Sequence, residues 1–220
     1  MYSRVPDGID GYISRGQHLE GEDFIKQEIK KRSNSVLLRY HYAKYLKEQR
    51  SELQQAINIL ESILKPSNNH QSVLRQLIAC YVSLDIPMYE RAGVYVAEME
   101  NTPIDDDDLR LEIAEFYARW STSLKMTREV SSDPIKEMLR QRRYRELADK
   151  ALGWLGHVVE KSHRFYYLFA QSHFNKWDND EALTAIDKAI LICGKESACF
   201  SSYSHLRDVV LRYKLRYPRR

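Results

Sequence analysis

The sequence predicts an all-α fold built from helical hairpins. Helix-breaking residues are scarce, with only 8 glycines and 6 prolines among 220 residues. Residues 165–190, FYYLFAQSHFNKWDNDEALTAIDKAI, show two helical patterns separated by the polar break 176–180. A longer period is also visible, since four positions keep their size and character 36 residues later. They are Leu38, Tyr45, Ala56 and Leu60, followed by Leu74, Tyr81, Ala92 and Val96.

Composition places the chain among ordinary globular proteins. Apolar residues make up 43% and charged residues 30%, and the net charge of +3 comes from 34 basic and 31 acidic residues. This balance gives no indication of nucleic-acid or membrane binding. Neither a membrane-spanning apolar run nor the apolar core of a signal peptide is present, so we expect a cytoplasmic protein without membrane contact. Cys80, Cys193 and Cys199 show neither CxxC nor metal spacing, which predicts reduced thiols.

The first hundred residues are expected to hold a lead-in, half a repeat and two full repeats. Residues 1–21 carry four glycines and predict a loose lead-in with a short helix near Ile13, and 22–32 predict one amphipathic helix. The repeats occupy 35–65 and 70–100, with helices at 35–48, 52–65, 70–84 and 87–100. Ser51 and Gln54 predict a capping box, and Pro87 predicts a first helical turn.

The period is interrupted between residues 101 and 147. A 36-residue step from Tyr81 reaches Tyr117 in a helical pattern, but the same step from Ala92 reaches Arg128 in a polar stretch. We expect an irregular repeat at 105–161, with helices at 105–125 and 134–161 around a loop. The acidic run 105–108 favours a helix start through the helix dipole, and Asp133-Pro134 predicts the second start.

The period recovers in the last third of the chain. Ala148 and Ala182 lie 34 residues apart, and 163–192 predict one clear repeat whose turn carries Asp178 and Glu181 in a capping arrangement. Residues 197–216 predict a helix that covers the end of the repeat array.

These residues resemble the tetratricopeptide repeat (TPR) family. Its first-helix pattern is filled by Tyr166, Phe169-Ala170 and His173, and its second-helix pattern by Ala182, Ile186 and Ala189. The resemblance is strong at 163–192, moderate at 35–65 and 70–100, and weak at 105–161. It implies a single domain over 1–220, a right-handed α-α superhelix, and a concave groove that binds a peptide or partner protein.

Counting from the resemblance gives the groove positions. Arginines there favour an acidic peptide or a terminal carboxylate, with ordinary solvated surface charge as the alternative. The two-carboxylate clamp of some family members needs asparagine where this chain has Ala43 and Ala79, so that partner class is disfavoured. The expected partner-binding residues are Arg39, Arg75, Arg164, Tyr167, Gln171 and Phe174.

The sequence contains no familiar catalytic, nucleotide or metal motif. We therefore expect a scaffold or adaptor that is not an enzyme and has no cofactor or metal. One alternative is a sensor or oligomerisation segment of a larger multidomain protein, such as a bacterial signalling or defence ATPase. A second is a helical repeat that binds RNA or DNA, although the basic clusters lack aromatic interleaving. The clusters are Arg140, Arg142, Arg143 and Arg145, and Arg207, Arg212, Lys214, Arg216, Arg219 and Arg220.

Overall fold

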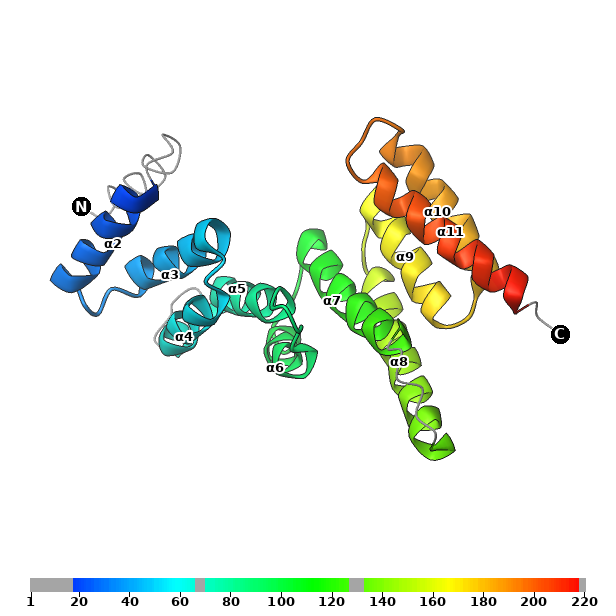
Figure 1. Cartoon of the computed structure of the whole chain (residues 1–220), viewed down its shortest axis with the longest axis horizontal. Helices are drawn as coiled ribbons and strands as arrows, with labels where there is room; N and C mark the ends of the chain where they lie inside the picture. The colour runs from blue at the N-terminus through cyan, green and yellow to red at the C-terminus, as the bar shows by residue number, and fades with distance from the viewer. Residues whose placement is uncertain (1–17, 66–69, 127–132, 218–220) are drawn as a thin grey trace. The chain divides into compact units, whose positions relative to one another are not determined.

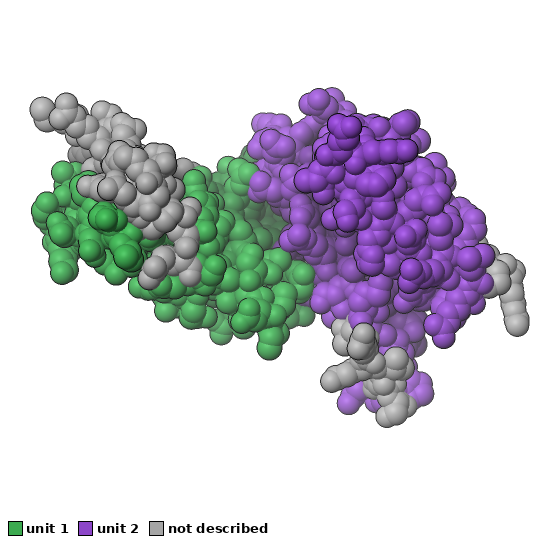
Figure 2. All heavy atoms as spheres, turned by 45° about the horizontal axis from the view of Figure 1, so that its top comes forward, with its two compact units in different colours: residues 1–103 green, residues 104–220 purple. Residues whose placement is uncertain are grey.

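The computed structural model describes residues 18–65, 70–126 and 133–217 (Figure 1). Within these ranges the chain is helical and has no strand, as the sequence predicts. The chain divides into two compact units, residues 1–103 and residues 104–220 (Figure 2), and each is described by itself. Most of the lead-in expected at 1–21 lies outside the described residues.

The first unit is a series of helices in which each packs against the next. The predicted half repeat is α2, and the two predicted repeats are the pairs α3–α4 and α5–α6. Ala56 and Ala92, the small positions of the 36-residue period, are fully buried in the second helix of each pair. The helices are α2 (His18–Lys31), α3 (Val36–Tyr45), the π-helix η1 (Leu46–Arg50), α4 (Leu53–Leu64), α5 (His70–Val82) and α6 (Tyr89–Glu100).

Periodic apolar residues build the core of this unit. In α4 the residues Ala56, Leu60 and Ile63 are buried at helical spacing, so one face of the helix is apolar. Two tyrosines combine apolar packing with hydrogen bonding. Glu61 accepts hydrogen bonds from the hydroxyls of Tyr81, at 2.6 Å, and Tyr95, at 2.9 Å. Their rings stack with centroids 5.9 Å apart.

The capping box predicted at Ser51 is wrong. α3 continues as a π-helix, and Ser51 closes it in the left-handed region with φ 55°. The N–H groups of Ser51 and Glu52 both reach the Leu46 carbonyl, so Ser51 ends the π-helix. Glu52 occupies the N-cap position of α4 without a side-chain hydrogen bond. The helix predicted to begin at Pro87 begins at Tyr89, after the N-cap Met88.

The second unit contains five described helices, which pack in two groups. α7 and α8 form an antiparallel pair against which α9 packs, and α10 and α11 continue from α9. The fully buried Ala148, Ala182 and Ala189 mark the recovered period. The helices are α7 (Asp107–Met126), α8 (Pro134–Leu155), α9 (His163–Asn175), α10 (Asn179–Cys193) and α11 (Phe200–Arg216).

The acidic run 105–108 at the start of α7 does more than begin a helix. Asp107 accepts hydrogen bonds from the backbone N–H groups of Val159, at 2.9 Å, and Glu160, at 3.1 Å. α8 ends at Leu155 and not near 161, and these two bonds fasten the segment after it to the start of α7. At its other end α8 begins as predicted, with the Asp133 carboxylate accepting the Ile135 N–H at 2.9 Å.

The α9–α10 turn differs from its predicted capping arrangement. Asp178 makes no side-chain cap; its carboxylate lies 3.3 Å from Nδ1 of His173. The turn is made by Trp177, which has φ 67° and donates from Nε1 to the Tyr144 hydroxyl at 2.8 Å. An aromatic residue in the left-handed region is uncommon, and this bond to α8 holds it there.

The prediction of three reduced cysteines is wrong for two of them. Cys193 and Cys199 form a disulfide that joins the end of α10 to the start of α11. Their separation of six residues is not a recognised pairing motif, so spacing alone gave no signal. Cys80 is a free thiol and is fully buried, and burial raises its pKa to about 11.

Candidate functional site

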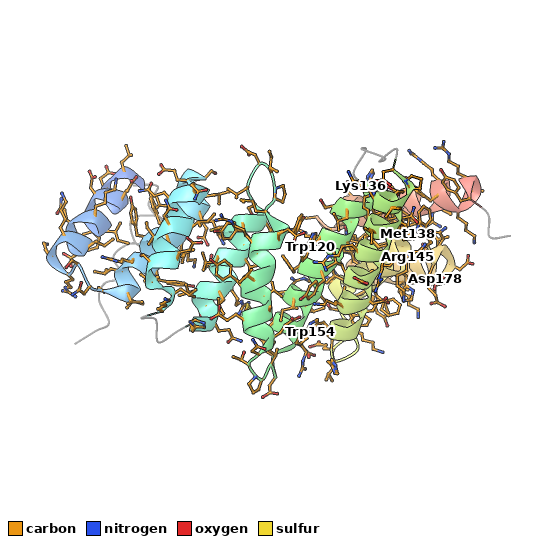
Figure 3. All side chains as sticks on the ribbon, turned by 90° about the horizontal axis from the view of Figure 1, so that it is seen from below. Trp120, Lys136, Met138, Arg145, Trp154 and Asp178 are labelled. Carbon is orange, nitrogen blue, oxygen red and sulfur yellow. A yellow bond between two sulfur atoms is a disulfide. The ribbon has the colours of Figure 1, made fainter. Side chains whose placement is uncertain are left out.

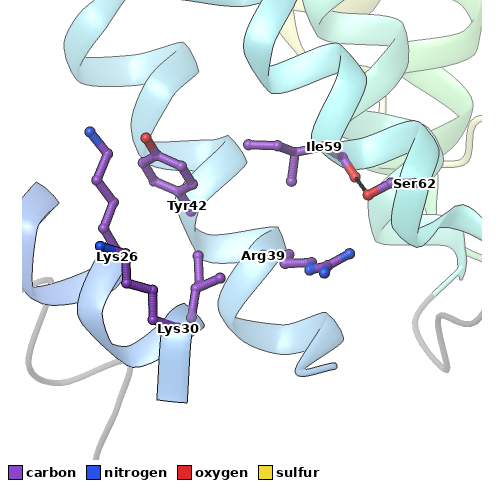
Figure 4. Close-up of a pocket in the computed structure, with 7 residues that line it drawn as sticks. Lys26, Lys30, Arg39, Tyr42, Ile59 and Ser62 are labelled. Atoms are coloured by element: carbon purple, nitrogen blue, oxygen red, sulfur yellow. Dashed lines mark hydrogen bonds between the residues drawn. The ribbon is translucent and has the colours of Figure 1, made fainter. Parts of the chain in front are cut away.

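A pocket on the first unit brings basic and apolar side chains together. It holds about 360 Å³ and lies among α2, α3 and α4 (Figure 4). The α2 lysines stand on one side of the pocket and Arg39 of α3 on the other. The lining residues are Lys26, Ile29, Lys30, Arg39, Tyr42, Ile59 and Ser62.

The apolar wall follows from helix periodicity. Ile25 is fully buried and anchors α2, and one turn later Ile29 is only half-buried, so it lines the pocket. The Tyr42 ring from α3 and Ile59 from α4 complete the wall. Such a surface suits the aliphatic or aromatic part of a ligand.

Two of the polar groups are already engaged within the unit. Nζ of Lys26 lies 2.6 Å from Oε1 of Glu22, and this hydrogen bond raises the pKa of Lys26. The Tyr42 hydroxyl also donates to Oε1 of Glu22, at 3.5 Å, and burial raises the pKa of Tyr42. Lys26 thus has a local counter-charge that helps fix its position.

Lys30 and Arg39 are the lining cations that can still pair with an anion of a ligand. Neither forms an ion pair within the described part of the chain; Lys30 is exposed and Arg39 is half-buried. The Ser62 hydroxyl donates to the Ile59 carbonyl at 2.6 Å, which leaves its oxygen able to accept. The pocket can therefore hold a carboxylate or another anion beside an apolar group.

The pocket combines one predicted site residue with two that sequence reading missed. Arg39 lines it, whereas the other arginine predicted for this unit, Arg75, is half-buried on α5 and does not. Lys26 and Lys30 were missed, although their spacing places them together on α2 beside the apolar stripe of Ile25 and Ile29. That i, i+4 pair of lysines is the signal that could have found them.

The α9 residues predicted for the groove are engaged with neighbouring helices of the second unit. Arg164 pairs with Glu115 of α7 at 2.6 Å. The Tyr167 ring stacks on Tyr203 of α11, with centroids 4.5 Å apart, and burial raises the pKa of Tyr167. Both side chains remain half-buried, so each keeps part of its surface open to solvent.

Two α9 residues expected in the groove lie in the interior, which corrects their assignment. Gln171 is 8% exposed and donates to the Thr122 hydroxyl of α7 at 2.9 Å. Phe174 is 0% exposed and packs edge-on against Tyr213 of α11. α11 packs alongside α9 and covers a position that repeat counting had left open.

Two of the four arginines in the basic cluster of α8 pair with carboxylates of the same helix. Arg140 forms two hydrogen bonds to Glu137, at 2.9 and 2.7 Å, and Arg142 pairs with Glu146 at 2.8 Å. Arg143 lies over the Trp120 ring at 5.0 Å. Arg145 is exposed.

The C-terminal basic cluster shows the same tendency where it is described. Arg207 pairs with Asp187 and Lys214 with Asp180, each at 2.6 Å. Arg216 lies over the Tyr217 ring at 5.7 Å, and Arg212 is exposed. Arg219 and Arg220 lie outside the described residues.

Comparison with known proteins identifies the fold. A thermophilic TPR protein of Thermus thermophilus is similar in structure, with a TM-score of 0.51 and 15% identity over 94% of this chain and 97% of that one. MamA AMB-1 gives 0.55 and 14% identity over 90% and 93%, and MamA MSR-1 gives 0.53 and 13% over 93% and 95%. The chain has a TPR-like fold. No family model and no curated protein matches its sequence.

Identities this low carry the likeness no further than the fold. None of the described helices is long and apolar enough to cross a membrane. In the same ranges no group of three or more His, Cys, Asp or Glu side chains is arranged to hold a metal ion.

Proposed function

We propose that this TPR-like chain is a protein-interaction adaptor whose first unit binds an acidic segment of a partner protein. The binding group would be a side-chain or terminal carboxylate next to an apolar residue. The protein would act by holding its partner and not by catalysis, and it would need no cofactor.

One observation carries the proposal: Arg39 and Lys30 border an apolar pocket without an ion pair among the described residues. The guanidinium can form two parallel hydrogen bonds to a carboxylate, and such charge-assisted bonds contribute about 1.5–3 kcal/mol. Ile29, Tyr42 and Ile59 offer apolar contact to the neighbouring residue.

The pocket is compatible with one of the two alternative functions, a sensor or oligomerisation segment, and gives no support to the other, nucleic-acid binding. A sensor or oligomerisation segment of a larger protein could use the same pocket for a segment of that protein, so the test below applies to it as well. Nucleic-acid binding is less well supported, because Arg140, Arg142, Arg207 and Lys214 already pair with carboxylates. A cation engaged in this way contributes less to phosphate binding.

A peptide array followed by affinity measurement tests the proposal. Peptides with acidic residues beside apolar ones, with free and amidated C-termini, are screened on the full chain, and binders are measured by fluorescence anisotropy. Arg39→Glu should weaken binding by at least about tenfold, since it removes a charge-assisted bond and adds repulsion. Raising the salt concentration should also weaken it.

Lys44→Glu provides the matched control. Lys44 is exposed on the same helix, α3, and does not line the pocket, so this variant makes the same charge change elsewhere. It should bind as the unmodified protein does. Equal affinity of the Arg39→Glu variant and the unmodified protein would rule the pocket out as the binding site.

A further inference from the structure

In the first turns of α8 the face toward the protein is polar and the face toward solvent is apolar, the opposite of an ordinary surface helix. Their inner face, toward α7, carries Glu137, Arg140 and Gln141, all partly buried. Glu137 binds both of the others, Gln141 at 3.0 Å, and Arg140 also donates to the Leu124 carbonyl at the end of α7. Polar contacts therefore join the helices at this end.

The opposite face of these turns is apolar and open. Ile135, Met138 and Leu139 are 65%, 62% and 53% exposed. Their i, i+3, i+4 spacing places them on one stripe, directly opposite the buried Tyr144 and its helical neighbours. We call these three residues the outer face of α8.

This arrangement is not explained by packing within the unit. The first turns of α8 extend beyond α9, α10 and α11 (Figure 1). A helix whose only task was to pair with α7 would turn Ile135, Met138 and Leu139 inward. Three large apolar side chains on one exposed stripe instead have the spacing of a helix–helix contact.

The charges beside the outer face favour one kind of partner. Lys136 and Arg145 are exposed and form no ion pair among the described residues, and they lie with Met138 along α8 (Figure 3). Arg142 continues the outer stripe, with Glu146 as its counter-charge. This basic surround attracts acidic flanks, and it opposes a symmetric contact with a second copy, which would bring like charges together.

We propose that the outer face of α8 is a second docking surface, which binds an amphipathic helix of a partner protein whose apolar stripe is flanked by Asp or Glu. The partner helix would pack its apolar residues on Ile135, Met138 and Leu139, and its acidic flanks would meet Lys136 and Arg145. This surface is independent of the pocket on the first unit.

Three synthetic helical peptides test the proposal on the full chain. The first has a leucine stripe flanked by glutamate, the second the same stripe flanked by lysine, and the third the composition of the first with the stripe scrambled. The first should bind, and more weakly as salt rises, while the other two should not. Fluorescence anisotropy measures the affinities.

Paired variants locate the binding. Met138→Ser with Leu139→Ser should weaken binding of the acidic peptide by at least about tenfold, because two apolar side chains that the bound peptide would bury are lost. Leu191→Ser with Ile192→Ser, exposed on α10 at 83% and 51%, should leave it unchanged. Retained binding in the first variant, equal loss in the second, or no preference among the peptides would overturn the proposal.

Two further measurements exclude other occupants. Self-association in sedimentation that disappears in the Met138→Ser, Leu139→Ser variant would show a second copy on this face and overturn the proposal. Binding to phosphatidylserine vesicles without binding to the acidic peptide would show a membrane surface and overturn it also. Neither is expected.

Discussion

Lys125 shows how a single residue can depart from the repeat pattern. It is 8% exposed at the end of α7, where its ammonium lies 3.5 Å from the Phe174 ring centroid, 4.3 Å from that of Trp177 and 5.7 Å from that of Tyr213. It also donates to the Phe174 carbonyl. No carboxylate among the described residues pairs with it, so burial, with a smaller contribution from Arg145, lowers its pKa to about 7.

The lowered pKa of Lys125 predicts a pH-dependent stability. An unfolded chain holds this proton up to the ordinary pKa of 10.5, whereas the folded chain loses it near pH 7. Between those values the unfolded state binds more protons, so stability should rise with pH and be lowest at and below pH 7. Thermal unfolding followed at several pH values measures this slope.

Replacing Lys125 by an apolar residue should remove that slope. Lys125→Met should stabilise the protein at pH 7 by about 1–3 kcal/mol, since the rings offset only part of the desolvation cost and also favour methionine sulfur. Lys150→Met is the control, because Lys150 is exposed although it lies 4.9 Å from the Tyr117 ring. An identical pH dependence in Lys125→Met and the unmodified protein would contradict the account.

Among the elements, the second helix of each repeat is where sequence reading is most reliable. Ala56, Ala92 and Ala182 are all fully buried, because helices that approach closely leave room only for a small side chain at the contact. Prediction of helix caps from residues three positions apart was less successful. Serine and aspartate at 51 and 178 occur in several kinds of turn, and a π-helix and a left-handed tryptophan decided those turns.

The close-contact alanines predict a destabilising substitution. Ala92→Leu should lower the free energy of unfolding by about 1–3 kcal/mol through overpacking. Ala97→Leu adds the same side chain to an exposed position of α6 and should have little effect. Urea unfolding followed by circular dichroism compares the two, and an unaltered midpoint for Ala92→Leu would count against the repeat register.

At the scale of the whole molecule, the fold was more predictable than the candidate site. Helices follow from local periodicity, and nearly every one was placed within a few residues. The pocket depends on which helix lies beside which, so Lys26 and Lys30 could join Arg39 only once α2 was seen against α3. Phe174 was assigned wrongly for the same reason, since counting within a repeat does not reveal the helix that covers it.

The division of the chain at Pro103 predicts that each unit folds alone. The second unit has its own cores, one around Ala170, Ile186 and Tyr203 and one around Phe174, Ala182 and Val210. A fragment of residues 104–220 should therefore be helical and unfold cooperatively, since repeat proteins derive their stability from neighbouring helices. Circular dichroism on heating, beside a fragment of residues 1–103, measures this. A fragment 104–220 that is helical but melts without a cooperative transition would mean that its core depends on the first unit and that the chain is one continuous domain.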